Sequence, residues 1–259
     1  METKASELVT WFCVASAIAF VLFGMAGCGH RDAFCDLQRP EVAPIETSIR
    51  NGEVSTDRRS AVKVWSVGRG TLCTGSIIGP HTVLTAAHCL LGSRNSGFKT
   101  ATRADIDVDG VRYVGADGNY EAHPDYDGHG IRPMKGDMAV VWFDELLPEP
   151  YVSIAEAPTG CYPGLIAQGY GRDELGLFGG LRERVVYEVH HNKYHIFTTE
   201  GSCFGDSGGG LYAETPEGHT IIGVSSLLRK TDCTSRGRKG AAGYTNLFTY
   251  GAWAQARIF

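Results

Sequence analysis

The residues best suited to chemistry lie in one glycine-rich run, residues 201–210 (GSCFGDSGGG). A serine hydroxyl attacks a carbonyl only when it is exposed on a tight turn, relieved of its proton and flanked by donors for the oxyanion that forms. Gly205 and Ser207 could aim two backbone N–H groups at one point beside the Ser207 hydroxyl. The run therefore predicts a nucleophilic Ser207 beside an oxyanion hole made by Gly205 and Ser207, although glycine-rich runs are usually only turns.

A base and a carboxylate for such a serine lie elsewhere in the chain, next to apolar strand-like runs. His88 follows the apolar pair Val83-Leu84, and Asp137 precedes the apolar residues 138–141. An imidazole can take the serine proton and return it to the leaving group, while a carboxylate holds the imidazole in the required tautomer. We therefore expect His88, Asp137 and Ser207 to work together.

The three segments, in the order His, Asp, Ser, resemble the chymotrypsin-like (trypsin family) serine proteases. The resemblance covers roughly residues 49 to 259. It implies a serine endopeptidase that acts on protein or peptide substrates and needs no cofactor. It also implies two six-stranded antiparallel β-barrels with a C-terminal helix. His88 and Asp137 would come from the first barrel and Ser207 from the second.

The elements that must position these residues read as all-β, because short strand-like runs alternate with glycine-rich turns. The runs are 61–67, 75–78, 82–86, 138–143, 165–169, 185–189 and 221–225. Prolines 148 and 150 predict a boundary between a first barrel, about 49–148, and a second, about 151–259. Helical spacing appears at 250–257, where Trp253 and Ala256 are expected to face the body.

Composition excludes some classes of function. The chain has 259 residues, of which 43% are hydrophobic, so it can bury a core in one or two compact units. Its net charge of −5 and its lack of basic runs with interleaved aromatic residues argue against nucleic-acid binding. A monomer is expected.

The N-terminus is expected to direct export. Residues 8–29 carry no charge, so residues 1–27 are interpreted as a signal peptide or membrane anchor. Met25-Ala26-Gly27-Cys28 resembles a bacterial lipoprotein cleavage box, in which Cys28 would carry lipid. The alternatives are an ordinary signal peptide and an uncleaved anchor. An extracellular or periplasmic protein is expected, attached to the membrane if Cys28 is lipidated.

Eight cysteines in a chain with a leader, none in a C-x-x-C pair, indicate disulfides rather than a metal. The family resemblance implies three bridges: Cys73–Cys89, Cys203–Cys233 and Cys35–Cys161. The last would keep a cleaved propeptide attached. Residues 28–48 are interpreted as that propeptide or linker.

Residues 49–52 (IRNG) resemble the N-terminus that zymogen cleavage creates in this family. The new ammonium group of Ile49 would then lie beside Asp206, because a buried carboxylate needs a paired cation. Arg50 and Asn51 depart from the usual small residues. The alternative is that Ile49 simply begins a strand.

The resemblance also gives an expectation for specificity. Six residues before the nucleophile, where trypsin-like members have an aspartate, this chain has Gly201, so basic substrates lose their counter-ion. Leu228 should shorten the pocket, and Ala242 on the opposite wall should narrow it. Ser226 matches a serine that bonds the catalytic aspartate and lines the substrate strand. Cleavage after small or medium apolar residues is expected.

Two other interpretations stay open. An acidic preference would be supported by Ser202, Arg229 and Lys230. A protease-like binding module without turnover is the second, although family members of that kind usually lack a triad residue.

No metal site is expected. Residues 105–110 (DIDVDG) open like a calcium loop, but Ala116 stands where the bidentate glutamate belongs, so a strand entering an Asp-Gly turn is expected. His190, His191 and His195 have no accompanying ligand set. His123 is interpreted as structural.

Overall fold

The structure is a computed structural model that describes residues 52–92, 99–128, 135–156, 164–172, 178–199, 202–216, 218–228 and 242–259. These residues all belong to one compact unit, 44–259. Within the described residues, no helix has both the length and the apolar character needed to cross a bilayer.

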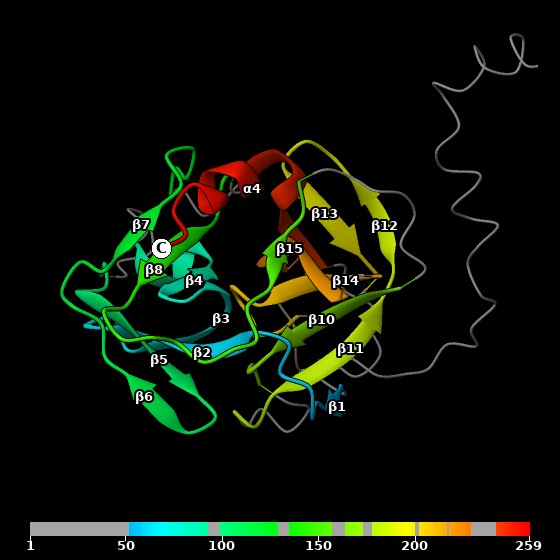
Figure 1. The fold of residues 1–259 in the computed structure, drawn as a ribbon. Coiled ribbons are helices and arrows are strands. Elements are labelled where there is room, and N and C mark those ends of the chain that lie inside the picture. The colour runs from blue at the N-terminus through cyan, green and yellow to red at the C-terminus, as the bar shows by residue number, and fades with distance from the viewer. Residues whose placement is uncertain are drawn as a thin grey trace, which may run out of the picture. The chain divides into compact units, whose positions relative to one another are not determined.

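The first sheet has seven strands in the order β6-β5-β2-β3-β4-β8-β7, all antiparallel (Figure 1). The strands are β2 (Ala61–Val67), β3 (Thr71–Gly79), β4 (Thr82–Thr85), β5 (Arg103–Val108), β6 (Val111–Tyr113), β7 (Tyr120–Ala122) and β8 (Ala139–Trp142). The predicted Asp-Gly turn is confirmed between β5 and β6, where Asp109 and Gly110 both have positive φ, as this tight hairpin turn requires.

This sheet curls until its two edges meet. The edge strands β6 and β7 are separated by only six residues, 114–119, and pair with β5 and β8 respectively. The side chain of Asn119 joins those two strands: it accepts the Ala104 N–H (2.9 Å) and donates to the carbonyls of Ala104 and Trp142 (both 3.0 Å). Counted as one interrupted strand, β6 and β7 make this a six-stranded barrel.

The second sheet has the order β1-β11-β10-β14-β15-β16-β13-β12, with β9 beside β15. Its strands are β1 (Glu53–Val54), β9 (Ser153–Ile154), β10 (Leu165–Gly169), β11 (Arg182–Val186), β12 (Glu188–His191), β13 (His195–Thr198), β14 (Gly210–Thr215), β15 (Gly218–Leu228) and β16 (Ala242–Asn246). Only Tyr187 separates β11 from β12, so the strand that pairs with β10 continues into the strand that pairs with β13. This sheet closes in the same way.

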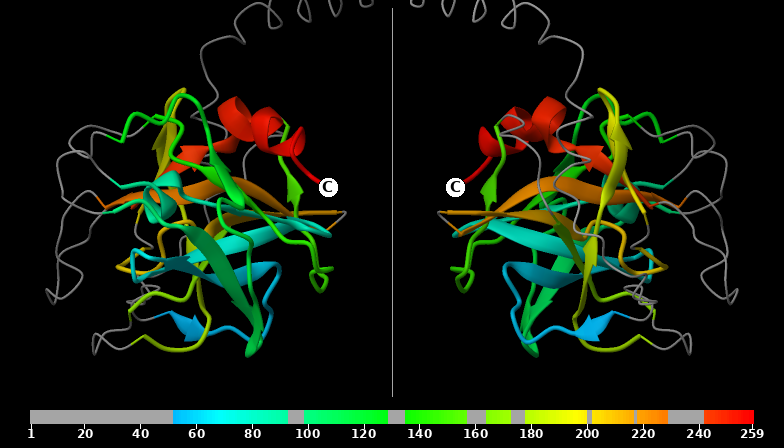
Figure 2. Two further views of the ribbon diagram at one scale, coloured as in Figure 1. Left: turned by 90° about the vertical axis from the view of Figure 1, so that its left-hand side faces the viewer. Right: turned by 90° about the vertical axis from the view of Figure 1, so that its right-hand side faces the viewer.

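The expected fold is therefore confirmed: two antiparallel β-barrels of six strands each, once interrupted strands are joined, followed by a helix. The short strands β1 and β9 add to the second sheet, and β9 pairs in parallel. Figure 2 shows the two sheets from the sides. The barrels share one core cluster, which includes Val64, Leu84 and Val140 from the first and Tyr212 and Ile221 from the second.

The C-terminal helix α4 (Leu247–Gln255) contacts both barrels, and it begins three residues earlier than predicted because the Asn246 side chain caps it by accepting the Phe248 N–H. Trp253 is half-buried, as expected, but Ala256 is exposed, so that prediction was wrong. Ala256 lies beyond the last helical residue, and the buried positions are Leu247, Tyr250, Gly251 and Ala254.

Replacing Asn119 by alanine should weaken the closure of the first barrel. It leaves three buried backbone groups of β5 and β8 without partners, so we expect the free energy of unfolding to fall by about 2 to 4 kcal/mol. Urea unfolding measures this, with Asp117→Ala as a control because the Asp117 side chain is 84% exposed. Equal losses in the two variants would contradict the role given to Asn119.

Candidate active site

His88 and Asp137 meet because of strand pairing. His88 lies in the short helix α3 (Ala87–Leu90), which follows β4. Asp137 lies two residues before the first residue of β8. Since Thr85 pairs with Ala139, both residues lie at the same end of this strand pair. His88 Nδ1 is 2.7 Å from Asp137 Oδ2, and the His88 backbone N–H donates to Oδ1 (2.9 Å). One carboxylate thus orients both the ring and the backbone of His88.

Asp137 is fully buried, and the second barrel supplies further partners for it. The Ser226 hydroxyl donates to Oδ2 (2.5 Å), and the Thr245 hydroxyl donates to the Asp137 backbone carbonyl (2.9 Å). Burial alone would raise the pKa of Asp137, but the charge and hydrogen bonds of His88, with the bond from Ser226, outweigh it and hold the pKa below its ordinary value. The carboxylate is therefore ionised and tied to the histidine.

Ser226 reaches Asp137 because β15 is irregular there. Ser225 pairs with Tyr244 and Leu227 with Gly243, so Ser226 is an extra residue in the ladder. Such a bulge changes the direction of a side chain.

The turn that carries Ser207 is held through its carbonyl groups. The Phe204 carbonyl accepts the Arg172 N–H (2.9 Å), and the Asp206 carbonyl accepts the Gly209 N–H (2.8 Å). Because C=O and N–H point in opposite directions across a trans peptide, the N–H groups of Gly205 and Ser207 face away from these bonds. Within the described part of the chain, neither N–H donates a hydrogen bond. Both are free to bind an oxyanion.

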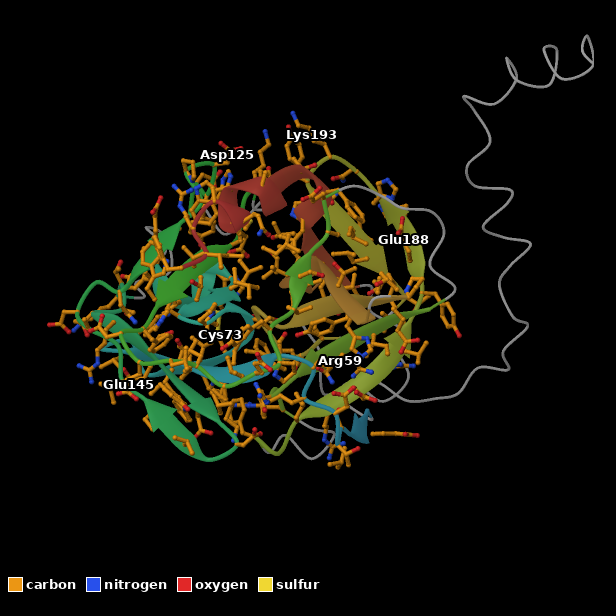
Figure 3. The ribbon with its side chains drawn as sticks, in the orientation of Figure 1. Arg59, Cys73, Asp125, Glu145, Glu188 and Lys193 are labelled. Atoms are coloured by element: carbon orange, nitrogen blue, oxygen red, sulfur yellow. A yellow bond between two sulfur atoms is a disulfide. The ribbon has the colours of Figure 1, made fainter. Side chains whose placement is uncertain are left out.

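Ser207 lies against the elements that carry His88. Its carbonyl accepts the Thr74 N–H (2.8 Å), and the disulfide Cys73–Cys89 joins the residue before Thr74 to the residue after His88 (Cys73 is labelled in Figure 3). This predicted bridge is present in the structure. The Ser207 hydroxyl makes no hydrogen bond to another described residue, so it is available for a substrate.

A glycine is required directly after the nucleophile. Gly208 has φ +83°, and an added Cβ would collide with Thr74 and Thr85. Without a side chain, the nucleophile turn can pack directly on the strands that lead to His88.

Asp206, next to the nucleophile, is buried between two glycines. Its oxygens accept the N–H groups of Gly171 (2.7 Å) and Cys203 (2.8 Å), and a Cβ on Gly169 or Gly171 would overlap its carboxyl group. Burial raises the pKa of Asp206 to about 7, and no described cationic side chain offsets this rise. A carboxylate in such a place favours a cation beside it.

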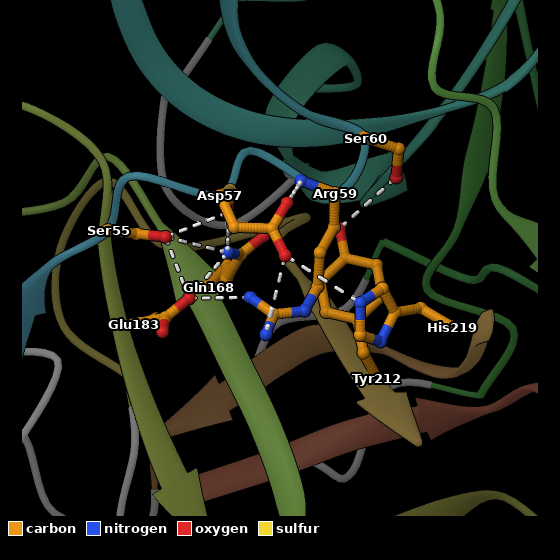
Figure 4. A network of polar contacts seen from close by, with 8 residues as sticks. All are labelled: Ser55, Asp57, Arg59, Ser60, Gln168, Glu183, Tyr212 and His219. Atoms are coloured by element: carbon orange, nitrogen blue, oxygen red, sulfur yellow. Dashed lines mark hydrogen bonds and ion pairs between the residues drawn. The ribbon is translucent and has the colours of Figure 1, made fainter. Parts of the chain in front are cut away.

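The segment after the predicted activation site is anchored on the second barrel (Figure 4). Arg59, which is buried with φ +51°, contacts Glu183 (2.5 Å), and Glu183 also accepts from Ser55 (2.7 Å) and Gln168 (2.9 Å). Arg182 Nη1 donates to the Gly52 carbonyl (3.0 Å). The chain is thus held from Gly52 onward, three residues after Ile49.

Part of the expected specificity pocket is described. Ala242 is fully buried in β16 and pairs with Leu228 in β15, so the two positions are direct cross-strand neighbours. The Ser202 hydroxyl is buried without a partner among the described residues. Gly201, Arg229 and Lys230 lie outside those residues.

Several other predicted sites also lie outside the described residues: Cys28, Cys35, Ile49, Cys161 and Cys233. Cys203 is disulfide-bonded, and its expected partner is Cys233. Two of the other histidines pack against aromatic rings: His123 lies edge-on against Tyr250 and Trp253, and His190 stacks on Phe197. No cluster of potential metal ligands occurs among the residues that the structure describes.

Sequence reasoning missed two threonines of the site. Thr245 and Thr74 are both fully buried, and each bonds the backbone of a predicted catalytic residue. Thr74 stands in the cysteine motif that pointed to the disulfide, but nothing in that motif indicates a role for its hydroxyl. Thr245 lies outside every motif that the sequence analysis used.

Comparison with known proteins agrees with this geometry. Residues 49–254 match the protein family described as Trypsin. The chain is also similar to Lectizyme of Glossina austeni, with 28% identity over an alignment of 223 positions; the match covers 71% of this chain and 77% of that protein. The family match covers most of the chain and spans both barrels. The chain therefore belongs to the trypsin family, the chymotrypsin-like serine proteases.

Proposed function

We propose that this protein is an active serine endopeptidase in which Ser207 is the nucleophile, His88 the general base and acid, and Asp137 the group that orients His88. The observation that carries the proposal is the pairing of His88 with a buried, ionised Asp137 beside a turn that presents two unbonded N–H groups. Family membership gives the reaction class, hydrolysis of peptide bonds.

In the proposed mechanism the Ser207 oxygen attacks the substrate carbonyl carbon while its proton passes to His88 Nε2. The carbonyl oxygen becomes an oxyanion and accepts the N–H groups of Gly205 and Ser207. Asp137 stabilises the imidazolium that forms. The C–N bond then breaks, the His88 proton goes to the leaving amine, and water, activated by His88, hydrolyses the acyl-enzyme.

The protein is further proposed to be made as a zymogen. Asp206 is buried without a described cation, and the chain from Gly52 onward is already anchored, which leaves a short segment to carry a new N-terminus. Cleavage after Ser48 would give Ile49 an ammonium group to pair with Asp206. A Cys35–Cys161 bridge would keep the propeptide attached.

Export is also part of the proposal. The Cys73–Cys89 disulfide is typical of oxidising compartments, and the uncharged N-terminal segment can direct the chain there. Membrane attachment would follow if Cys28 is lipidated.

Residues 49–148 and 151–259 are proposed as the two barrel regions, although β1, which belongs to the first range, pairs with the second sheet.

Substrates with small or medium apolar side chains before the cleaved bond are proposed, since Gly201 supplies no counter-ion and Leu228 would occupy part of the pocket. The buried Ala242 beside Leu228 supports a narrow wall. Trypsin-like cleavage after Arg or Lys is not expected.

Activity should require both His88 and Ser207. We expect His88→Ala and Ser207→Ala each to lower kcat by about 10⁴-fold or more, because the two residues act as one unit. Labelling by a fluorophosphonate probe should be lost in both. His123→Ala, which removes a histidine outside the site, is the control and should label normally. A folded wild-type protein that has been cleaved after Ser48 and still never labels would favour the binding-module alternative.

The stability of the uncleaved chain should depend on Asp206. Burial raises the pKa of Asp206 to about 7 in the folded state, from the ordinary value of 3.8, so the folded protein keeps this proton to a higher pH than the unfolded chain does. Stability therefore falls as pH rises from about 4 to about 7, by a few kcal/mol in order of magnitude. Urea unfolding in a Ser207→Ala background, with and without Asp206→Asn, measures this slope.

Cleavage after Ser48 should flatten that slope, because the Ile49 ammonium would stabilise ionised Asp206. Asp117→Asn, which changes an exposed carboxyl group, serves as the control and should keep the slope. Identical slopes before and after cleavage would count against the proposed pairing.

The preference for the substrate residue before the cleaved bond should depend on Leu228. In a positional peptide library we expect cleavage mainly after Ala, Val or Leu, and Leu228→Gly should raise kcat/KM for Phe relative to Ala by about 10-fold or more. Leu227→Ala, one residue earlier in β15, is the control. Dominant wild-type cleavage after Arg, Lys or an acidic residue would refute the apolar pocket.

A further inference from the structure

Thr74 in β3 connects three parts of the site. It is fully buried, and its N–H donates to the Ser207 carbonyl (2.8 Å). Its hydroxyl donates to the Gly205 carbonyl (2.9 Å) and accepts the Tyr170 N–H (3.0 Å). Its own carbonyl accepts the Thr85 hydroxyl (2.7 Å). Every hydrogen-bonding group of Thr74 is thus used within the site or beside it.

The bonds made by Thr74 fix the peptide between the two proposed oxyanion donors and the peptide that directly follows the second donor. The hydroxyl holds the carbonyl of the Gly205–Asp206 peptide, and the backbone N–H holds the carbonyl of the Ser207–Gly208 peptide. Gly205 has φ +98°, a conformation that glycine leaves easily. Without the hydroxyl, the Gly205–Asp206 peptide loses its bond to the first barrel and keeps, among the described residues, only the bond from its Asp206 N–H to the Cys203 carbonyl (3.1 Å). It is then held less firmly, and any tilt of this peptide changes the direction of the neighbouring N–H groups.

The hydroxyl also links this turn to the pocket of Asp206. Tyr170, whose N–H bonds the Thr74 hydroxyl, directly precedes Gly171, whose N–H bonds Asp206. Only a side chain that both donates and accepts can hold the Gly205 carbonyl and the Tyr170 N–H together. Serine keeps that ability, while valine keeps the shape and loses it.

We propose that Thr74 is a positioning residue, whose hydroxyl holds the oxyanion turn in its working shape and couples that shape to the turn that binds Asp206. This inference rests on the proposed peptidase function. Thr74 contacts no reacting atom; it acts through the Gly205 and Ser207 peptides.

The test compares Thr74→Val with Thr74→Ser in protein that is made full-length and then cleaved after Ser48, with Thr82→Val as the matched control. Thr82 is an equally buried threonine of the same barrel, whose hydroxyl accepts the Phe259 N–H instead. We expect Thr74→Val to lower kcat by about 10- to 100-fold, toward the loss seen when an oxyanion donor is removed, while KM changes less than about 3-fold. Thr74→Ser should restore kcat to within about 3-fold of wild type, and Thr82→Val should leave it unchanged.

A second readout does not depend on activity. In a Ser207→Ala background, amide NMR should show shifted backbone signals at positions 205 and 207 and faster exchange of the Tyr170 N–H in Thr74→Val, but not in Thr74→Ser. Wild-type kcat in a folded Thr74→Val protein, or failure of serine to rescue, would overturn the proposal. If the wild-type protein never labels with a fluorophosphonate after cleavage, the proposed peptidase function is wrong. Unchanged amide signals in Thr74→Val would separately reject the role of Thr74.

Discussion

The site depends on one buried charge. Asp137 has no exposed surface, and an ionised carboxylate in such a place must be compensated by nearby donors. His88 supplies two of them, and Ser226 supplies a third. Moving the histidine ring would leave this charge short of partners, so the need to satisfy Asp137 also keeps His88 in position.

The partners of Asp137 come from both barrels, which makes the site a product of the barrel interface. His88 lies at the end of a first-barrel strand, whereas Ser226 and Thr245 belong to strands of the second. In the other direction, Thr74 of the first barrel bonds Gly205 and Ser207, which precede β14 of the second. Each barrel thus bonds a predicted catalytic residue that the other carries, and a shift of one barrel against the other would break these hydrogen bonds.

A second buried carboxylate, Asp206, differs from Asp137 because it has backbone donors but no described cation. Its pKa is raised to about 7, while that of Asp137 is lowered. The pKa values of the two carboxyl groups are therefore shifted in opposite directions within the same site. Asp137 is satisfied by the fold as described, whereas Asp206 would gain from a positive charge brought to it, which is the physical basis for proposing control by cleavage.

Local sequence was enough to predict strands such as β2 and β10, the Asp-Gly turn and the segments that carry His88, Asp137 and Ser207, because strand alternation and glycine turns are short-range patterns. The strands β13, β14 and β16 of the second barrel were not among the predicted runs. The Cys73–Cys89 bridge followed from family resemblance and is present in the structure. Ala256 was misplaced because helical spacing alone does not show where a helix ends. Thr74 and Thr245 were missed because their hydroxyls act only on partners far away in the chain. The sequence by itself determined which residues could do the chemistry. Only the tertiary structure decided which groups hold them in place, since those hydrogen bonds cross between two barrels that no local pattern relates.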